Sequence, residues 1–256
     1  MARAEAVQAH PVTVARASNS ARTLTRFAVD YAVQHPNRTI TLLQAGCTTA
    51  GQELDLVALR ASAHDLAICL VDDDSAAARA AIASRPELRS ATLGELRSVP
   101  IGPRSFDIVQ CSMVLHRISN AELVLGRLVA ALRPGGLLLL RTADRETAAG
   151  FLNRRTPRFL RALAGRAARP GQPGPFPARY EPITSARGIE AFVVRHGLVV
   201  ADRQACCAGG GHERNAAVPA RYWLVTWLSR GRLAASHDEL RYVIRKPEDQ
   251  FARLLP

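Results

Sequence analysis

Residues 39–51, TITLLQAGCTTAG, decide the fold of this chain. The first five residues form a short, mostly apolar run, which is typical of a strand buried in a sheet. The loop that follows holds Gly46 and Gly51, and a helix over about 52–63 is expected next. In open α/β sheets, ligands bind beyond the carboxyl ends of the strands, because glycines admit them close to the backbone and helix N-termini offer free N–H groups. The stretch therefore predicts a nucleotide-binding strand, loop and helix.

Two common phosphate-binding loops match this one poorly. A P-loop retains Gly46 and Gly51 but needs a lysine and a hydroxyl residue next, where the chain has Gln52 and Glu53. The dinucleotide fingerprint also retains the two glycines, but Thr48 stands at its central glycine position, where a side chain would crowd a pyrophosphate. The P-loop is excluded, and the dinucleotide loop is left as a competing interpretation.

Strands and helices alternate along the rest of the chain. Apolar runs predict strands, and runs with helical spacing predict helices between them, with Ser75 and Asn120 as expected N-caps. The expected strands are 39–43, 66–71, 93–96, 106–111, 137–141, 198–200 and 240–245, and the expected helices are 20–34, 52–63, 75–84, 120–132, 156–166, 189–196 and 222–228. This alternation predicts an α/β fold with a parallel sheet covered by helices on both faces. We expect one domain over 1–256 that begins with a mobile tail over 1–17.

The stretch 42–141 resembles the class I S-adenosylmethionine-dependent methyltransferases, especially the group of small-molecule enzymes that includes those acting on quinones, lipids and natural products. The family's first motif usually reads acid-x-Gly-x-Gly-x-Gly, and the corresponding residues here are Gln44, Gly46, Thr48 and Ala50. Further segments match in order: 105–115 as the fourth strand and its exit, 132–138 as the turn into the fifth strand, and 245–247 as the close of the seventh. The resemblance implies a Rossmann-like, seven-stranded, mostly parallel sheet with an antiparallel last strand.

The resemblance also implies S-adenosylmethionine as cofactor. Asp72, or else Asp73, would hold the ribose hydroxyls, since a carboxylate accepts two hydrogen bonds from a diol. Glu95 would contact the adenine amino group and Leu96 would flank the ring, while Cys111 belongs to the cofactor-binding set at the exit of the fourth strand. The acidic run at 72–74 equally suits a solvated helix N-terminus, where acids are favoured.

The loop departs from the family's pattern in three places. Gln44 replaces the carboxylate that holds the methionine ammonium end, so it offers an acceptor without a charge. Thr48 and Ala50 add side chains where the backbone should lie close to the cofactor. Three functions therefore stay open. They are methyl transfer to a hydrophobic small-molecule or lipid-like acceptor, a member of the fold that no longer methylates, and RNA methylation.

Two histidines are candidates for the chemistry. Methyl transfer is an in-line displacement, in which the protein aligns donor and acceptor and removes at most one proton. His116, at the exit of the fourth strand, is placed to face the transferring methyl as a base, and a packed or capping histidine is the equal alternative. His212, beside Glu213 in a glycine-rich loop, is the second candidate, with a mobile surface loop as the alternative. The sequence predicts no metal site, because it has no HExxH motif and no Cys/His cluster.

The second half of the chain supplies the substrate side. The family places its lids after the fifth strand and between the sixth and seventh, here 145–187 and 205–238. The second lid holds Tyr222, Trp223 and Trp227, which indicates an aromatic lining and a hydrophobic acceptor. The segment 151–169 mixes arginines with apolar residues, a pattern typical of peripheral contact with anionic lipid, of an acidic and hydrophobic substrate, or of a solvated helix.

Composition narrows the partners and the compartment. The net charge is +12, but Lys246 is the only lysine among 34 basic residues, and the arginines are spread along the chain. This pattern indicates the coding bias of a GC-rich bacterial genome more than a nucleic-acid surface. The family's signature for methylating base amines is also absent at 111–114. Five cysteines without paired spacing, no apolar run of roughly 18–20 residues and no apolar core near the N-terminus predict a cytoplasmic protein.

Overall fold

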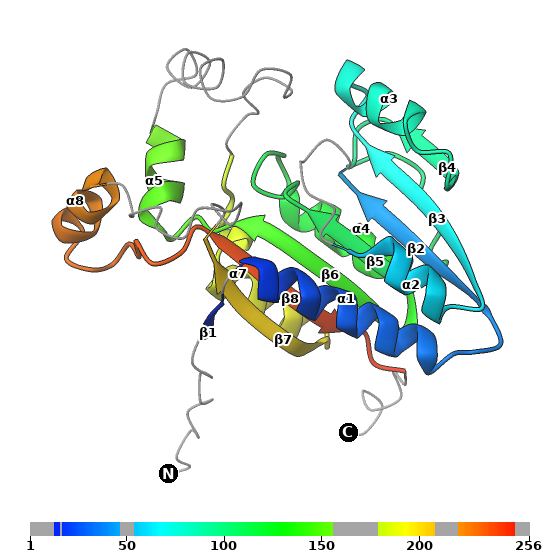
Figure 1. The fold of residues 1–256 in the computed structure, drawn as a ribbon. Coiled ribbons are helices and arrows are strands. Elements are labelled where there is room, and N and C mark those ends of the chain that lie inside the picture. The colour runs from blue at the N-terminus through cyan, green and yellow to red at the C-terminus, as the bar shows by residue number, and fades with distance from the viewer. Residues whose placement is uncertain (1–12, 16, 47–53, 156–178, 208–219, 249–256) are drawn as a thin grey trace, which may run out of the picture.

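The protein folds around one eight-stranded sheet, seen in a computed structural model that describes residues 13–15, 17–46, 54–155, 179–207 and 220–248 (Figure 1). The strands are β1 (Thr13–Ala15), β2 (Thr39–Ala45), β3 (Asp65–Asp72), β4 (Leu88–Leu93), β5 (Phe106–Ser112), β6 (Leu132–Ala143), β7 (Val199–Cys206) and β8 (Glu239–Arg245). The helices are α1 (Ala17–Val33), α2 (Leu56–Ser62), α3 (Ala76–Ala83), α4 (Ala121–Ala131), α5 (Ala148–Arg155), the 3₁₀ helix η1 (Pro182–Thr184), α7 (Ala186–Arg195) and α8 (Ala220–Leu228).

The strand order confirms the predicted Rossmann-like α/β sheet. The order is β1-β7-β8-β6-β5-β2-β3-β4, and only β8 runs antiparallel to its neighbours. The chain moves outward from β2 through β3 to β4, and then returns to β5 on the other side of β2. The carboxyl ends of β2 and β5 therefore meet where the strand order reverses, which is where an open α/β sheet binds its ligand.

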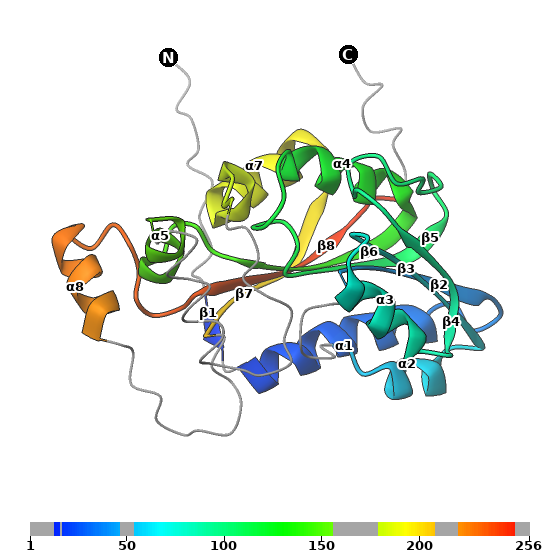
Figure 2. The ribbon, with the colours of Figure 1, turned by 90° about the horizontal axis from the view of Figure 1, so that it is seen from above.

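Two apolar layers hold the helices to the sheet, one on each face (Figure 2). Leu42 and Leu43 show the division, because successive strand residues point to opposite faces. Leu42 packs with α1 and α2, whereas Leu43 packs with α4 and α7. Burial on both faces explains why β2, β5 and β6 read as nearly continuous apolar runs.

The structure corrects several boundaries. Thr13–Ala15 pair in parallel with β7, so a strand lies inside the tail expected over 1–17 and the sheet has eight strands instead of seven. The third predicted strand, 93–96, is wrong: β4 is Leu88–Leu93, and the next residues turn, with the amides of Ser98 and Val99 both donating to the Glu95 carbonyl. Helix α5 was not predicted, and the helix expected over 156–166 lies outside the described residues.

Helix α4 is capped by residues from distant segments. Asn120 adopts a left-handed backbone conformation and makes no side-chain cap, contrary to prediction, whereas Ser75 does cap α3. The Glu181 carboxylate instead accepts the amides of Asn120 and Ala121, at 2.7 and 2.8 Å. At the other end, Lys246 Nζ donates to the carbonyls of Val129 and Leu132. Both contacts satisfy backbone groups that a helix leaves unpaired at its ends.

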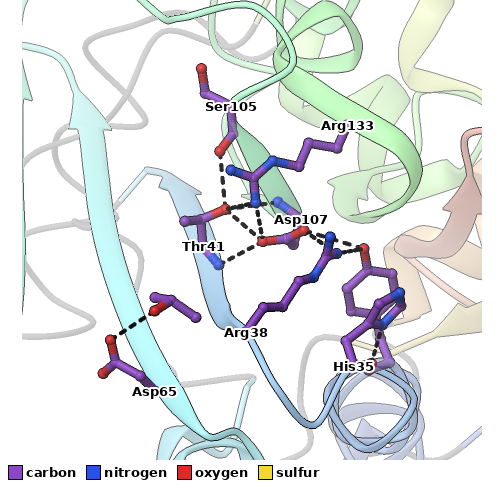
Figure 3. Close-up of polar contacts among 9 residues, drawn as sticks. His35, Arg38, Thr41, Asp65, Ser105, Asp107 and Arg133 are labelled. Carbon is purple, nitrogen blue, oxygen red and sulfur yellow. Dashed lines mark hydrogen bonds and ion pairs between the residues drawn. The ribbon is translucent and has the colours of Figure 1, made fainter.

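The amino end of the sheet is held by a buried carboxylate, Asp107, at the start of β5 (Figure 3). Its oxygens accept from the amide and hydroxyl of Thr41 on β2, at 2.9 and 2.8 Å, and from Arg133 at 2.7 Å. Arg38 and the hydroxyl of Tyr31 complete the set. Burial alone would raise the pKa of Asp107, but the hydrogen bonds from Thr41 and Arg133 hold it below its ordinary value. This network fixes β5 against β2.

Candidate cofactor and acceptor site

Gly46 begins the predicted cofactor loop immediately after β2. Its φ is +90°, a conformation that L side chains rarely adopt, and its amide donates to the Val71 carbonyl at 3.0 Å. A Cβ at this position would collide with the Val114 side chain and touch the Ser112 carbonyl. Glycine is therefore required here by the backbone and by the neighbouring exit of β5. Thr48 and Ala50, predicted for the same loop, lie outside the described residues.

Gln44 offers a buried acceptor at the point where the family usually has a carboxylate. Its Nε2 donates to Oε1 of Gln110, the neighbouring residue on β5, at 2.8 Å. Its own Oε1 is buried and has no hydrogen-bond partner among the residues that the structure describes. A buried oxygen left unpaired costs about 1–3 kcal/mol, so a ligand N–H that reached it would bind there favourably. The ammonium end of S-adenosylmethionine is such a donor, and in this respect the site fits the cofactor.

Asp72 ends β3 as a buried carboxylate, at the place predicted for the ribose contact. Its charged neighbour is Arg117, which follows His116 directly and was not predicted as a site residue. Burial lowers the pKa of Arg117 to about 10, and the Asp72 and Asp73 carboxylates oppose that shift. Burial and the adjacent Asp72 raise the pKa of Asp73. The carboxylate meant for a ribose diol thus lies in the field of an internal cation.

The remaining predicted contacts are not drawn together. Glu95 lies beyond β4, its side chain is 57% exposed, and it forms an ion pair with Arg97. Leu96 is buried in the apolar layer beside α4. Cys111 is fully buried, and burial together with the Asp72 carboxylate raises the pKa of its thiol to about 12. The described residues thus gather Gln44, Gly46 and Asp72 at the switch point but leave Glu95 facing solvent.

His116 is buried, with 8% of its surface exposed, behind the ring of Tyr180 at a centroid distance of 5.4 Å. Burial, with the charges of Arg117 and Arg141, lowers its pKa to about 3, so the imidazole is neutral at pH 7. Its Nδ1 is buried and has no hydrogen-bond partner within the described ranges. A base with so low a pKa captures protons weakly at neutral pH, because general-base catalysis works best when the pKa lies near the working pH. Orienting an acceptor through Nδ1 suits this group better.

Backbone strain flanks His116 on both sides. Met113, at the exit of β5, has a φ of +54°, and Tyr180 has a φ of +49°. Such conformations are unfavourable for residues other than glycine and are concentrated at functional sites. The amides of Arg179 and Tyr180 both donate to the His116 carbonyl, at 2.9 and 3.1 Å. The substrate-side segment after residue 178 is therefore attached directly to the exit of β5.

A further histidine, which was not predicted as a site residue, lies beside the end of β6. His237 Nε2 lies 3.0 Å from Asp144 Oδ2, and its Nδ1 lies 3.2 Å from the Ser236 hydroxyl. A buried carboxylate that orients an imidazole is a common arrangement for a base. The only signal in the sequence was an acid directly after the fifth strand. The other predicted base, His212, lies outside the described residues.

An arginine-lined cleft of about 430 Å³ opens between α5, η1 and α7. Its lining holds four arginines, Arg145, Arg154, Arg187 and Arg195, together with two acidic residues, Glu122 and Glu146. Burial and the neighbouring charge of Arg145 lower the pKa of Arg154. The predicted aromatic lining is not seen here: Trp223 and Trp227 are exposed, on a helix at the far end of the molecule (Figure 1). Because one of the two glutamates, Glu122, is paired with Arg195, the remaining lining carries more positive than negative charge.

Within the described ranges, no helix is both long and apolar enough to span a bilayer. The same ranges hold no group of three or more His, Cys, Asp or Glu side chains arranged to bind a metal.

Comparison with known proteins supports the fold and the domain. Residues 43–140 match the family model described as a methyltransferase domain. Loganic acid methyltransferase superposes with a TM-score of 0.56 at 11% identity, and the match covers 90% of this chain and 93% of that chain. An S-adenosylmethionine-dependent methyltransferase from Mesorhizobium loti superposes with a TM-score of 0.55 at 16% identity, and the match covers 90% of this chain and 99% of that chain. The 4+2 cyclase SpnF superposes with a TM-score of 0.52 at 16% identity, and the match covers 89% of this chain and 81% of that chain.

No curated protein matches the sequence significantly. This chain therefore has the Rossmann-like fold of the class I S-adenosylmethionine-dependent methyltransferases, and its residues 43–140 match a methyltransferase domain.

Proposed function

We propose that the protein transfers a methyl group from S-adenosylmethionine to a hydrophobic small-molecule or lipid-like acceptor. The observation that carries the proposal is the buried Gln44 Oε1, which has no partner among the described residues and lies on the strand next to the one that ends at Asp72. The cofactor supplies an electrophilic methyl on its sulfonium. In this chain Gln44 would accept from the ammonium end, Gly46 would allow close approach, and Asp72 would accept from the ribose hydroxyls.

The acceptor would lie between His116 and the arginine-lined cleft. The segment 179–185 connects the two, because Tyr180 faces His116 while Pro182, Ile183 and Ser185 line the cleft. Arginines favour a carboxylate or phosphate on the acceptor. One fold neighbour is a loganic acid methyltransferase, which supports a small organic acid as a test substrate. The protein would be a bacterial enzyme of natural-product metabolism, and the free thiols of Cys69, Cys111, Cys206 and Cys207 support a cytoplasmic location.

A non-methylating member of the fold is the second candidate. Arg117 faces Asp72 and Asp73, where a ribose would need a free carboxylate, and Gln44 lacks the usual charge. The cyclase among the fold neighbours supports this alternative. Under it, the pocket serves another reaction or a partner.

Isothermal titration calorimetry with S-adenosylmethionine and S-adenosylhomocysteine separates the candidates. We expect both to bind with dissociation constants in the micromolar range, about −8 kcal/mol. Methyl transfer to a panel of small organic acids and their neutral esters then tests the acceptor. Absence of heat with either cofactor form, from protein whose folding is shown by circular dichroism, would overturn methyl transfer and leave the second candidate.

A further inference from the structure

Helix α8 presents a continuous apolar face to solvent. Trp223, Leu224, Trp227 and Leu228 are 61%, 56%, 76% and 65% exposed. Their spacing of one, four and five residues places them on one side of the helix. Tyr222, Val225, Thr226 and Ser229 alternate with them and are half-buried. Four large apolar side chains on one exposed face form a patch of the kind that marks an interaction surface.

No described element covers this face. Helix α8 packs beside α5, and both lie at the end of the molecule away from the parallel part of the sheet (Figures 1 and 2). A second cleft, of about 470 Å³, lies between them and is lined by Phe151, Leu228, Ser229, Arg230, Arg232 and Leu233. Neither tryptophan lines this cleft or the arginine-lined one.

The charged side chains that α5 and residues 220–234 contribute are all positive. The sequences of α5 and of 220–234 contain no acidic residue. Arg155, Arg230 and Arg232 are exposed, and Arg155 lies over the Phe151 ring at 5.7 Å. A second copy of a chain with net charge +12 would bring like charges together across this face. An anionic surface complements both the apolar face and its basic border.

We propose that α8, with the end of α5, docks on an anionic lipid bilayer. The tryptophan and leucine side chains would enter the interface between headgroups and acyl chains, where the amphipathic indole ring is favoured. The arginines would contact lipid phosphates, as on the polar border of interfacial helices. The proposal concerns a surface outside the acceptor site, so it holds whether or not the protein methylates.

Intrinsic fluorescence tests the proposal directly, because the only two tryptophans of the chain both lie on α8. Vesicles of phosphatidylglycerol and phosphatidylcholine should shift the emission to shorter wavelength, and brominated acyl chains should quench it. Binding to these vesicles should exceed binding to pure phosphatidylcholine by at least about tenfold and should weaken with salt. Unchanged emission with the protein left in the supernatant would overturn the proposal.

Variants identify the face. Trp223→Ser with Trp227→Ser, followed by vesicle sedimentation, should abolish binding, whereas Val194→Ser, at an exposed valine of α7, should not. Arg230→Glu with Arg232→Glu should reduce binding to anionic vesicles at least about tenfold. Arg60→Glu with Arg89→Glu, which changes the net charge equally at exposed sites elsewhere, is the matched control. Equal loss in both charge variants would refute a specific face. A dimer seen by sedimentation equilibrium, lost with the tryptophans, would assign the face to a second copy.

Discussion

Buried polar groups are hydrogen-bonded differently at the two ends of the sheet. At the amino end, Asp107 receives hydrogen bonds from Thr41, Arg133, Arg38 and Tyr31, and its pKa is lowered (Figure 3). At the carboxyl end, buried atoms of Gln44 and His116 have no partner among the described residues, and the pKa of His116 falls to about 3 because burial penalises its charge. The Asp107 carboxylate is fully paired, although the Nε of Arg38 in the same network has no partner within the described ranges. A paired buried carboxylate stabilises the native state, whereas unpaired buried atoms carry a cost that a ligand would remove. We therefore expect substitutions at the amino end to act mainly on stability and those at the carboxyl end to act mainly on binding.

The largest effect is expected at the amino end. Asp107→Ala should lower the free energy of unfolding by about 3–5 kcal/mol, because it leaves Arg133 and the amide of Thr41 without their buried partner. Urea denaturation measures the change. Asp65→Ala removes an exposed carboxylate that accepts from Thr39, and it should cost less than about 1 kcal/mol. Equal losses in the two variants would contradict the special position of Asp107.

A smaller loss of stability is expected from substitution of Gly46, the glycine that follows β2. Gly46→Ala should cost about 1–3 kcal/mol, since alanine is strained at a φ of +90° and its Cβ meets Val114. The double variant with Val114→Ala should recover only the steric part. Gly231→Ala is a useful reference, because Gly231 has a similar φ, +77°, but open space around its Cβ position. If Gly46→Ala destabilised the protein no more than this reference, the crowding at Val114 would be unimportant.

The two ends should also lose stability in different pH ranges. His116 has a folded pKa of about 3, below its ordinary value near 6.5, so the unfolded chain binds the extra proton between these values. Stability should therefore fall as pH drops below about 6.5, by up to about 1.4 kcal/mol per pH unit from this residue, until about pH 3. Asp107, whose pKa is lowered, loses its contribution only as the pH falls below its unfolded value toward the folded one.

Denaturation at a series of pH values checks the histidine's share. His116→Gln should flatten the slope between about pH 6 and 4 relative to wild type, because glutamine does not titrate. His64→Gln, at an exposed histidine, serves as control and should leave the slope in place. A slope that survives in His116→Gln would place its origin elsewhere.

The smallest effect should appear in cofactor affinity. Gln44→Glu is isosteric and adds a charge opposite the expected ammonium group, so S-adenosylmethionine should bind about tenfold tighter, close to 1.4 kcal/mol. Calorimetry at equal pH for both proteins measures it. Gln110→Glu places a charge on the neighbouring strand and should give no comparable gain. Weaker binding in Gln44→Glu would show that this atom does not face the ammonium end.

Much of the scaffold could be predicted from local patterns. The runs at 66–71 and 106–111 are strands within one or two residues of their observed ends, and Ser75 caps α3 as expected. These features depend on burial of consecutive residues and on hydrogen bonds within a few positions. Strand 93–96 was wrong because β4 is half exposed and lacks an apolar signal, and β1 was missed because three residues carry no periodicity.

The site was predictable only in part. Gln44, Gly46 and Asp72 follow strands whose carboxyl ends meet, so their proximity follows from the order of elements. Arg117, the His237–Asp144 pair and the arginine-lined cleft did not follow, since their partners come from segments far apart in the chain. Predictions for Thr48, Ala50 and His212 stay predictions.

By itself, the sequence determined the α/β fold, the switch point and the residues at the carboxyl end of each strand, because apolar periodicity and chain order are local properties. Only the tertiary structure decided how these residues are electrostatically placed. It placed Arg117 in the electrostatic field of Asp72 and buried His116 so that its imidazole is neutral at pH 7. It also left Gln44 Oε1 without a partner among the described residues and capped α4 with Glu181 and Lys246. Charge, burial and hydrogen bonding depend on neighbours that are close in space, and these neighbours are remote in sequence.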